Sequence, residues 1–247
     1  MATAAAVGVV LVAAGGHGSR DRLRVIVQQQ CLPHWLHERR PDPCLSVSVG
    51  AADADAMARG YAILHDRKGG AHFLLIATRT VTGIESPALE EPAAPNYFDA
   101  AWSSRGVLSS YLGHTVQRSA VGLALNSIRA RSQDQLHIHI ECLRPGIFAA
   151  LALNANRIQP RWTEMEVDGH AYQALRISGE DLGAQNPVQL LAAAMPAPVV
   201  RAGKYTMLVA GMQYVDGPGF AVLASATARG AELLLDPTCE VATEASR

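Results

Sequence analysis

Two histidines separated by one residue occupy a segment that otherwise has the composition of a buried β-strand, "SQDQLHIHIECLRP". Side chains alternate between the two faces of a strand. One face of this segment therefore carries aliphatic residues that can enter a core, Leu136, Ile138 and Ile140. The other face carries polar residues, Gln135, His137, His139 and Glu141. The chain thus places two imidazoles on a face that must be polar or open to solvent.

Metal binding is one chemistry that this spacing allows. Residues two apart on a strand are separated by about 6–7 Å, so both rings can converge on one ion. A third ligand is then required, and the sequence offers His72, His114 and Glu141. A structural role is the simpler alternative, in which both histidines lie at a partly hydrated sheet edge.

Nucleophilic catalysis is the third possibility. Imidazole attacks phosphorus well at neutral pH, provided that a neighbouring group fixes its tautomer. Hydrogen-bond donors surround the strand in the sequence: Asn126, Ser127, Arg129, Arg131, Ser132 and Gln133 before it, and Arg144 after it. Such donors can neutralise phosphate oxygens as a transition state develops. The surroundings of the histidines therefore favour phosphate chemistry.

The composition is that of an ordinary globular protein with a distinctive start. The 21 basic residues nearly cancel the 22 acidic ones, which argues against nucleic acid as a partner. Residues 1–18 are mostly apolar, but about 20 apolar residues are needed to span a bilayer. We therefore expect a signal peptide or a short membrane anchor there, with a flexible leader as the alternative.

The chain contains four cysteines, Cys31, Cys44, Cys142 and Cys239. An even number of cysteines after an expected export signal suggests two disulfides. Cys31 and Cys44 flank a proline-rich loop and form a natural local pair, which leaves Cys142 to pair with Cys239. The alternative is four reduced thiols in the core of a cytosolic protein. No C-x-x-C motif is present, which argues against a zinc ribbon.

The hydrophobic pattern predicts an α+β fold with an antiparallel sheet. Helices are expected at 19–30, stopping at Pro33, and at 97–113, 146–158 and 187–195. Strands are expected at 45–50, 119–127, 136–142 and 170–177, with hairpins at 61–78 and 204–225. The two hairpins each begin near a tyrosine, cross a glycine turn and end in a phenylalanine-led strand. This likeness suggests a degenerate internal repeat.

The segment "GLALNS", a basic turn and then "SQDQLHIHI" resemble the histidine-triad superfamily of nucleotide hydrolases and transferases. Its hallmark is His-x-His-x-His, and here Gln135 stands where the first histidine is expected. The resemblance implies that His137 is the nucleophile and His139 the last histidine. It also implies a histidine-triad-like sheet with flanking helices, a catalytic half at 19–150 and a C-terminal half at 151–247. If the second half is a decayed repeat, a monomer suffices, and a homodimer is the alternative.

Further segments resemble, more specifically, the CDP-diacylglycerol pyrophosphatases of bacterial envelopes: "QCLP", "DPC", "TGIESPAL", "PNYFDAAW", "LALNS", "HIHIECLRP" and a late "CE". The resemblance extends from about residue 22 to residue 241. It implies hydrolysis of CDP-diacylglycerol to CMP and phosphatidate through a covalent nucleotidyl-His137 intermediate. His139 would organise the site, and Gln135 would replace the first histidine. No metal and no cofactor are expected.

Several substrate contacts follow from the same resemblance. Asn126 and Ser132 stand where the superfamily binds ribose or phosphate, and Gln133 and Arg131 are further candidates with ordinary turn roles as the alternative. Arg144 is expected either to bind phosphate or to pair with Glu141. The lipid substrate implies contact with a membrane surface, at the extracytoplasmic or periplasmic side of the inner membrane. The alternatives are a histidine-triad hydrolase of a soluble nucleotide pyrophosphate, and a non-catalytic metal- or nucleotide-binding module.

Overall fold

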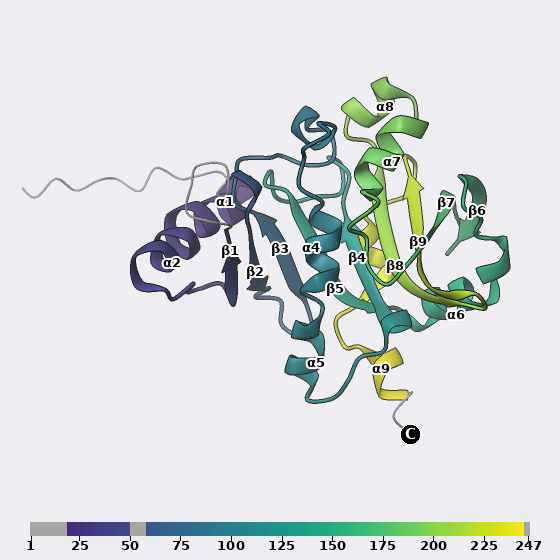
Figure 1. Cartoon of the computed structure of the whole chain (residues 1–247), viewed down its shortest axis with the longest axis horizontal. Coiled ribbons are helices and arrows are strands. Elements are labelled where there is room, and N and C mark those ends of the chain that lie inside the picture. Colours follow the sequence, from purple (N-terminus) through teal and green to yellow (C-terminus); the bar gives the residue numbers. More distant parts are fainter. Residues whose placement is uncertain (1–18, 50–57, 245–247) are drawn as a thin grey trace, which may run out of the picture.

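The computed structural model describes residues 19–49 and 58–244, so the expected leader at 1–18 lies outside the described residues. One antiparallel sheet runs through the molecule, and its strands have the order β1-β2-β3-β5-β4-β8-β9-β7-β6 (Figure 1). The strands are β1 (Ser46–Ser48), β2 (Tyr61–His65), β3 (Phe73–Ala77), β4 (Val121–Leu125), β5 (His137–Leu143), β6 (Thr163–Val167), β7 (His170–Ser178), β8 (Thr206–Tyr214), β9 (Gly217–Ser225) and the short β10 (Leu235–Asp236). The α+β prediction is confirmed.

The helices mostly follow the sequence prediction. They are α1 (Arg22–Ile26), α2 (Leu32–Glu38), α4 (Tyr97–Ser103), α5 (Gly106–Leu112), α6 (Pro145–Leu153), α7 (Pro187–Ala194), α8 (Ala197–Arg201) and α9 (Glu240–Glu244). Asn186 caps α7, because its side chain accepts the Val188 N–H at 3.1 Å. The expected helix at 97–113 is two helices, α4 and α5, separated at residues 104–105.

Two predictions about secondary structure were wrong. The first helix does not stop at Pro33, because a π-helical turn (Val27–Cys31) leads directly into α2. Pro33 then lies in the first turn of α2, where a missing N–H costs little. Strand β6 was not expected, although its sequence "TEMEV" alternates glutamate with apolar residues. The two glutamates are exposed and the intervening methionine is buried, as the period of a half-buried edge strand requires.

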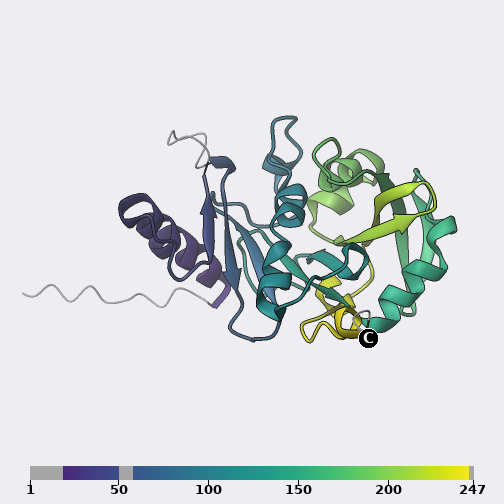
Figure 2. The same ribbon diagram turned by 60° about the horizontal axis from the view of Figure 1, so that its bottom comes forward.

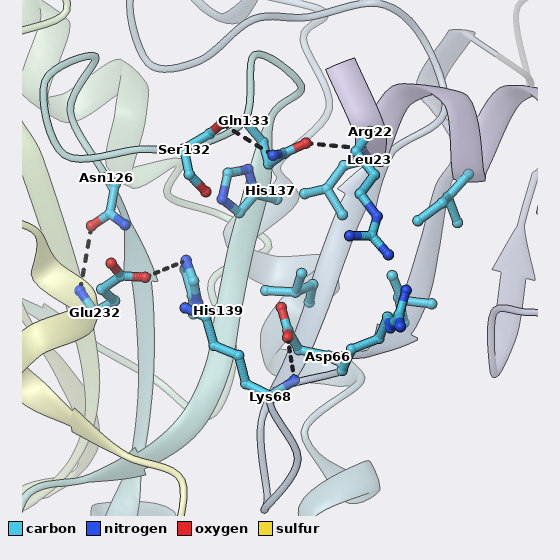
Figure 3. Close-up of a pocket in the computed structure, with 14 residues that line it drawn as sticks. Arg22, Leu23, Asp66, Lys68, Asn126, Ser132, Gln133, His137, His139 and Glu232 are labelled. Atoms are coloured by element: carbon cyan, nitrogen blue, oxygen red, sulfur yellow. Dashed lines mark hydrogen bonds and ion pairs between the residues drawn. The ribbon is translucent and has the colours of Figure 1, made fainter. Parts of the chain in front are cut away.

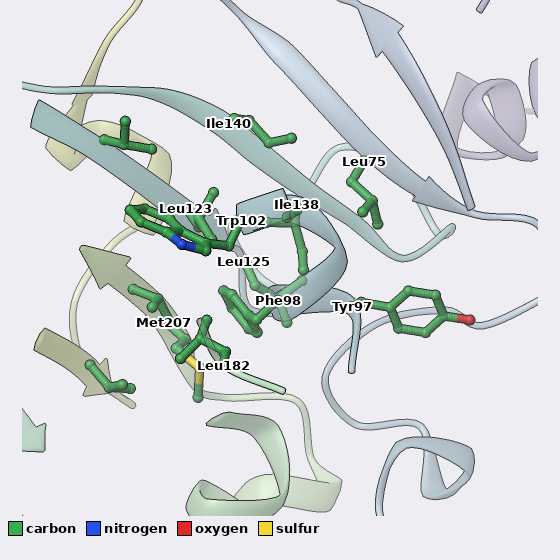
Figure 4. Packing of buried hydrophobic residues seen from close by; sticks show 14 of the residues in the cluster. Leu75, Tyr97, Phe98, Trp102, Leu123, Leu125, Ile138, Ile140, Leu182 and Met207 are labelled. Carbon is green, nitrogen blue, oxygen red and sulfur yellow. The ribbon is translucent and has the colours of Figure 1, made fainter. Parts of the chain in front are cut away.

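One face of the sheet packs on α4, α5 and α7 and carries the largest core cluster. Phe98 and Trp102 from α4 are buried against β5, where Ile138 and Ile140 point toward them (Figure 4). The expectation that Leu136, Ile138 and Ile140 enter the core is therefore confirmed. Since alternate residues of β5 fill this face, the histidines of the same strand must point to the other one.

The opposite face is covered at its two ends and left open between them. Residues of α1, the π-helical turn and α2 form one buried cluster with residues of β1, β2 and β3, for example Leu23, Val27 and Leu32 with Val47 and Leu74. Helix α6 packs on β7, β8 and β9 through Ile147 and Leu151. Figure 2 shows these two helical covers, purple and teal, at opposite ends of the molecule. The polar face of β5 lies between the two helical covers, where His137 and His139 line a cavity.

The connectivity of the sheet repeats. Strands β2, β3, β4 and β5, with α4 and α5 inserted after the second strand, have the order β2-β3-β5-β4. Strands β6, β7, β8 and β9, with α7 and α8 inserted likewise, have the mirrored order β8-β9-β7-β6, and the halves meet where β4 pairs with β8. By this connectivity β8–β9 corresponds to β4–β5. The hairpins at 61–78 and 204–225 therefore do not occupy equivalent places, and their sequence likeness does not reflect the repeat.

Both predicted disulfides are present, Cys31–Cys44 and Cys142–Cys239. The first joins the helical segment to the residues just before β1, and the second joins β5 to the residue before α9. The alternative of four reduced thiols is thereby excluded. Among the helices within 19–49 and 58–244, none combines the length and the apolar character that crossing a bilayer requires.

Candidate active site

The two histidines lie on the open face of β5, as the alternation predicted. His137 is opposite Ile76 of β3, and His139 is opposite Leu74 of β3 and Ala124 of β4. Their ring centroids are 5.2 Å apart. Both side chains are largely buried but line a cavity of about 440 Å³ between α1 and the residues around Glu232 (Figure 3). The rings therefore share one site that a ligand can reach.

The tautomer of His137 is fixed by the backbone. Its Nδ1 lies 2.7 Å from the carbonyl oxygen of Gln135, so Nδ1–H donates and Nε2 keeps its lone pair. Burial lowers the pKa of His137 to about 4, with a smaller effect from His139 in the same direction. The ring is consequently neutral near pH 7, with an unprotonated nitrogen beside the cavity. That is the form in which imidazole attacks phosphorus.

His139 belongs to a buried polar chain. Its Nδ1 lies 3.0 Å from Nε2 of His72, and the same nitrogen of His72 lies 3.2 Å from a carboxylate oxygen of Glu141. In its ionised form the carboxylate of Glu141 only accepts hydrogen bonds, so it favours a proton on Nε2 of His72, which is shared between Glu141 and Nδ1 of His139. This places the proton of neutral His139 on Nε2, which lies 3.3 Å from Oε2 of Glu232 without an aligned hydrogen bond.

Burial sets the charge of this chain. It lowers the pKa of His139, against the opposing effect of Glu232, and it raises the pKa of Glu141 to about 7. His139 is therefore neutral near neutral pH and offers an Nε2–H donor at the edge of the cavity. The same three residues could also hold a metal ion, because ligand atoms of His72, His139 and Glu141 all lie within 4.8 Å of one another.

Three of the predicted substrate contacts do line the cavity: Asn126, Ser132 and Gln133. Gln133 accepts the backbone N–H of Leu23 at 3.1 Å, which joins the loop before β5 to the start of α1. Asn126 is almost fully buried and lies near the backbone of Glu232, whose N–H is 3.4 Å from its Oδ1. The loop that precedes β5 thus forms one wall of the site, as its sequence suggested.

The other three predicted contacts lie outside the cavity lining. The Nε2 amide of Gln135 donates to the carbonyls of Ala77 and Arg79, each at 2.7 Å, and ties the end of β3 to the start of β5. Arg144 is exposed, donates to the Leu233 carbonyl at 3.0 Å and pairs with Asp168 rather than with Glu141. Both side chains contact protein groups, and neither lines the cavity.

Arg131 is likewise committed to protein groups. Its guanidinium forms two hydrogen bonds of 2.7 Å to the carboxylate of Glu85 and a third of 3.1 Å to Asp134. The side chain is almost completely buried. A buried bidentate pair of this kind fixes two loops relative to each other. Arg131 therefore positions the wall that carries Ser132 and Gln133.

Several lining residues were missed by the sequence analysis. The cavity is also lined by three cations, two acids and four apolar residues: Arg22, Arg67 and Lys68; Asp66 and Glu232; and Leu23, Ile26, Leu64 and Leu74. Figure 3 shows the side chain of Lys68 extending from the β2–β3 turn toward His139, and the charge of Lys68 helps to lower the pKa of His139. The sequence signal for Lys68 is its place in the turn of the hairpin expected at 61–78. The second strand of that hairpin, β3, lies beside β5, which brings the turn close to His139.

Comparisons with known proteins identify the family of the chain. The model of the family described as CDP-diacylglycerol pyrophosphatase matches residues 18–243. A curated CDP-diacylglycerol pyrophosphatase of Yersinia pestis is 37% identical over 229 residues, 90% of this chain and 84% of that protein. The class is therefore that of a hydrolase acting on a pyrophosphate bond. The chain belongs to the CDP-diacylglycerol pyrophosphatase family, which confirms the specific resemblance expected from its motifs.

Proposed function

We propose that the chain hydrolyses the pyrophosphate bond of CDP-diacylglycerol by attack of His137 Nε2 on the cytidylyl phosphorus. The observation that carries this proposal is the hydrogen bond of 2.7 Å between His137 Nδ1 and the Gln135 carbonyl, which leaves Nε2 unprotonated beside the cavity. The family match supplies the substrate. No proton has to leave the nucleophile before it attacks, so the ring is ready to react in its resting state.

The reaction then proceeds in two displacements at one phosphorus atom. In the first, the Nε2–P bond forms and the bridging P–O bond breaks, so phosphatidate leaves with the bonding electron pair. In the second, water attacks the same phosphorus and loses a proton to solvent, the N–P bond breaks with its electron pair returning to Nε2, and CMP leaves. His139 Nε2–H is positioned to donate to a phosphate oxygen in both steps, while Asn126 and Ser132 hold the nucleotide. Positioning and charge neutralisation supply most of the acceleration in such transfers.

The stereochemistry at phosphorus tests the covalent intermediate. A CDP-diacylglycerol analogue in which sulfur replaces one nonbridging oxygen has a stereogenic cytidylyl phosphorus, and a single isomer should be hydrolysed with overall retention there, because each in-line displacement inverts the centre. Hydrolysis in ¹⁸O-labelled water should place the label in CMP and not in phosphatidate. Inversion would show that water attacks directly, and label in phosphatidate would show attack at the other phosphorus. Either result rejects the proposed role of His137.

The pH dependence of kcat/KM should reflect the low pKa of His137. A nucleophile loses activity when it is protonated, and burial lowers the pKa of this ring to about 4. The limb that protonation of His137 causes should therefore lie near pH 4, below the separate titration of Glu141 near pH 7. In Glu141→Gln, which removes that second titration, an acid limb near pH 6.5, the value of an exposed histidine, would contradict a buried and neutral nucleophile.

Lys68 should contribute to charge neutralisation in the transition state. Replacement by methionine keeps the length of the side chain and removes its charge, and we expect kcat to fall about 10²-fold. Lys68 lies on an exposed turn, so the melting temperature should change little. Arg40→Met is a suitable control, because Arg40 is exposed and pairs with Glu38 away from the cavity. Equal kinetic losses in the two variants would remove Lys68 from the mechanism.

A metal-binding function is the second candidate, and one observation favours it. His72, His139 and Glu141 form a compact buried set of nitrogen and oxygen ligands. Zinc accepts this ligand combination. Under this alternative, purified protein would bind one equivalent of zinc and His72→Ala would abolish binding. Under the catalytic proposal, chelators leave hydrolysis of CDP-diacylglycerol unchanged.

The finer points of architecture and location also enter as proposals. The repeated connectivity supports a histidine-triad-like catalytic half at 19–150 and a degenerate second half at 151–247. Such a chain contains the long sheet of a dimer by itself, so a monomer would suffice, and the homodimer remains the alternative. Two disulfides are typical of an oxidising compartment, which supports a place outside the cytoplasm at the envelope membrane.

A further inference from the structure

A second cavity adjoins the catalytic one and has no role in the mechanism above. It has a volume of about 540 Å³ and shares Glu232 with the first cavity. Asn126 lines the first cavity and its neighbour Ser127 lines the second, so the two cavities come close together at this stretch of the chain. Its other lining residues include three cations from three separate segments, Arg129, Lys204 and Arg229. The two cavities thus meet at the wall of the active site.

Within the described part of the chain the three cations are in no ion pair, although the carboxylate of Glu232 lines the same cavity. Across residues 19–49 and 58–244, no carboxylate forms an ion pair with Arg129, Lys204 or Arg229, and all three are exposed. Other arginines of the chain differ, since Arg118, Arg131 and Arg176 are held by carboxylates or carbonyls. Three converging cations with free donors are suited to an anion, and most of all to a phosphate.

Two exposed aliphatic side chains border the same cavity. Leu233 lines it with half of its surface exposed, and Ile128, which precedes Arg129, is 41% exposed. Ile128 also lies close to Gly203, next to Lys204, since a Cβ at Gly203 would be 3.1 Å from the Cβ of Ile128. Aliphatic and basic side chains on one surface are the combination that enters the interface of an anionic membrane.

We propose that this second cavity binds the phosphate of the phosphatidyl half of the substrate while its acyl chains stay in the bilayer. The inference rests on the proposed function, because it requires the cytidylyl phosphorus to lie at His137. One bridging oxygen separates the two phosphorus atoms, so the second phosphate must lie within a few ångströms of the first. Arg129, Lys204 and Arg229 bind this second phosphate, and Ile128 and Leu233 contact the glycerol and interfacial region.

The test compares three substrates for the same active site. The first is CDP-diacylglycerol in phosphatidylcholine vesicles, the second is CDP-glycerol, and the third is a nitrophenyl ester of CMP, which lacks the second phosphate. In the variant Arg129→Gln/Lys204→Gln/Arg229→Gln, kcat/KM should fall about tenfold or more for each of the first two substrates relative to the third. The control triple variant Arg40→Gln/Arg157→Gln/Arg161→Gln removes three exposed arginines elsewhere and should keep the wild-type ratios.

A second variant separates the lipid surface from the phosphate. Ile128→Ser/Leu233→Ser should lower kcat/KM for the vesicle substrate and leave the CDP-glycerol value near that of the wild type. Flotation with phosphatidate-containing vesicles should show weaker binding for both the cation and the aliphatic variants. Unchanged substrate ratios in the cation variant, or equal losses on all three substrates, would overturn the proposal. Failure of the wild type to cleave any of the substrates would instead reject the proposed function.

Discussion

His137→Ala should reduce kcat for CDP-diacylglycerol by about 10⁴-fold or more, as is usual when an enzyme loses its nucleophile. The substitution removes the only atom that forms the N–P bond in the proposed mechanism. It leaves intact the buried chain of His72, His139 and Glu141. Product formation measured at saturating substrate, together with the melting temperature, separates loss of chemistry from loss of fold.

Two further measurements make this prediction specific to His137. Rapid quenching of the wild type should give protein whose mass has increased by one cytidylyl group, and the variant should give none. His114→Ala is a matched control, because this histidine is partly exposed and does not line the cavity. Turnover by His137→Ala at a rate close to that of the wild type would end the assignment. So would a trapped adduct that mapped to another residue.

The position of the histidines could be predicted because the cause is local. Alternation along one strand decides which face a side chain occupies, and Ile138 and Ile140 left only the polar face for His137 and His139. The wall formed by Asn126, Ser132 and Gln133 is equally local, since it immediately precedes the strand. The disulfides were predictable for a related reason, because four cysteines allow few pairings and one pair is close in sequence.

The chemistry around the histidines could not be predicted in the same way, because it depends on contacts between distant segments. Glu232 reaches His139 only because residues 231–236 fold back onto β5, where Leu235 pairs with Leu143. The charge of Arg131 makes it a candidate for phosphate, with a turn role as the alternative. In the structure its guanidinium pairs with Glu85, which lies 46 residues earlier, and no pattern in the sequence joins the two. A charge near a site thus has two possible uses, and only the fold distinguishes them.

The Cys142–Cys239 disulfide holds this arrangement, and its loss should cost the most stability of any single change to the covalent structure. The bond closes a loop with a sequence separation of 97 residues, whereas Cys31–Cys44 closes one of 13. The chain-entropy model gives about 4.7 kcal/mol for a loop of about 100 residues and about 3 kcal/mol for a loop of about 15. Replacement of each pair by alanine should follow that order in the free energy of unfolding measured with urea.

The same pair of variants also tests the link between the C-terminal half and the site. In Cys142→Ala/Cys239→Ala, residues 235–236 lose their covalent tie to β5, so Glu232 should be less well fixed beside His139. We expect kcat to fall in this variant at temperatures where it is still folded. In Cys31→Ala/Cys44→Ala, kcat should change little, since that bond ties the helical segment to β1. If the short-loop variant proved the less stable and the less active of the two, the C-terminal segment would have no part in holding His139.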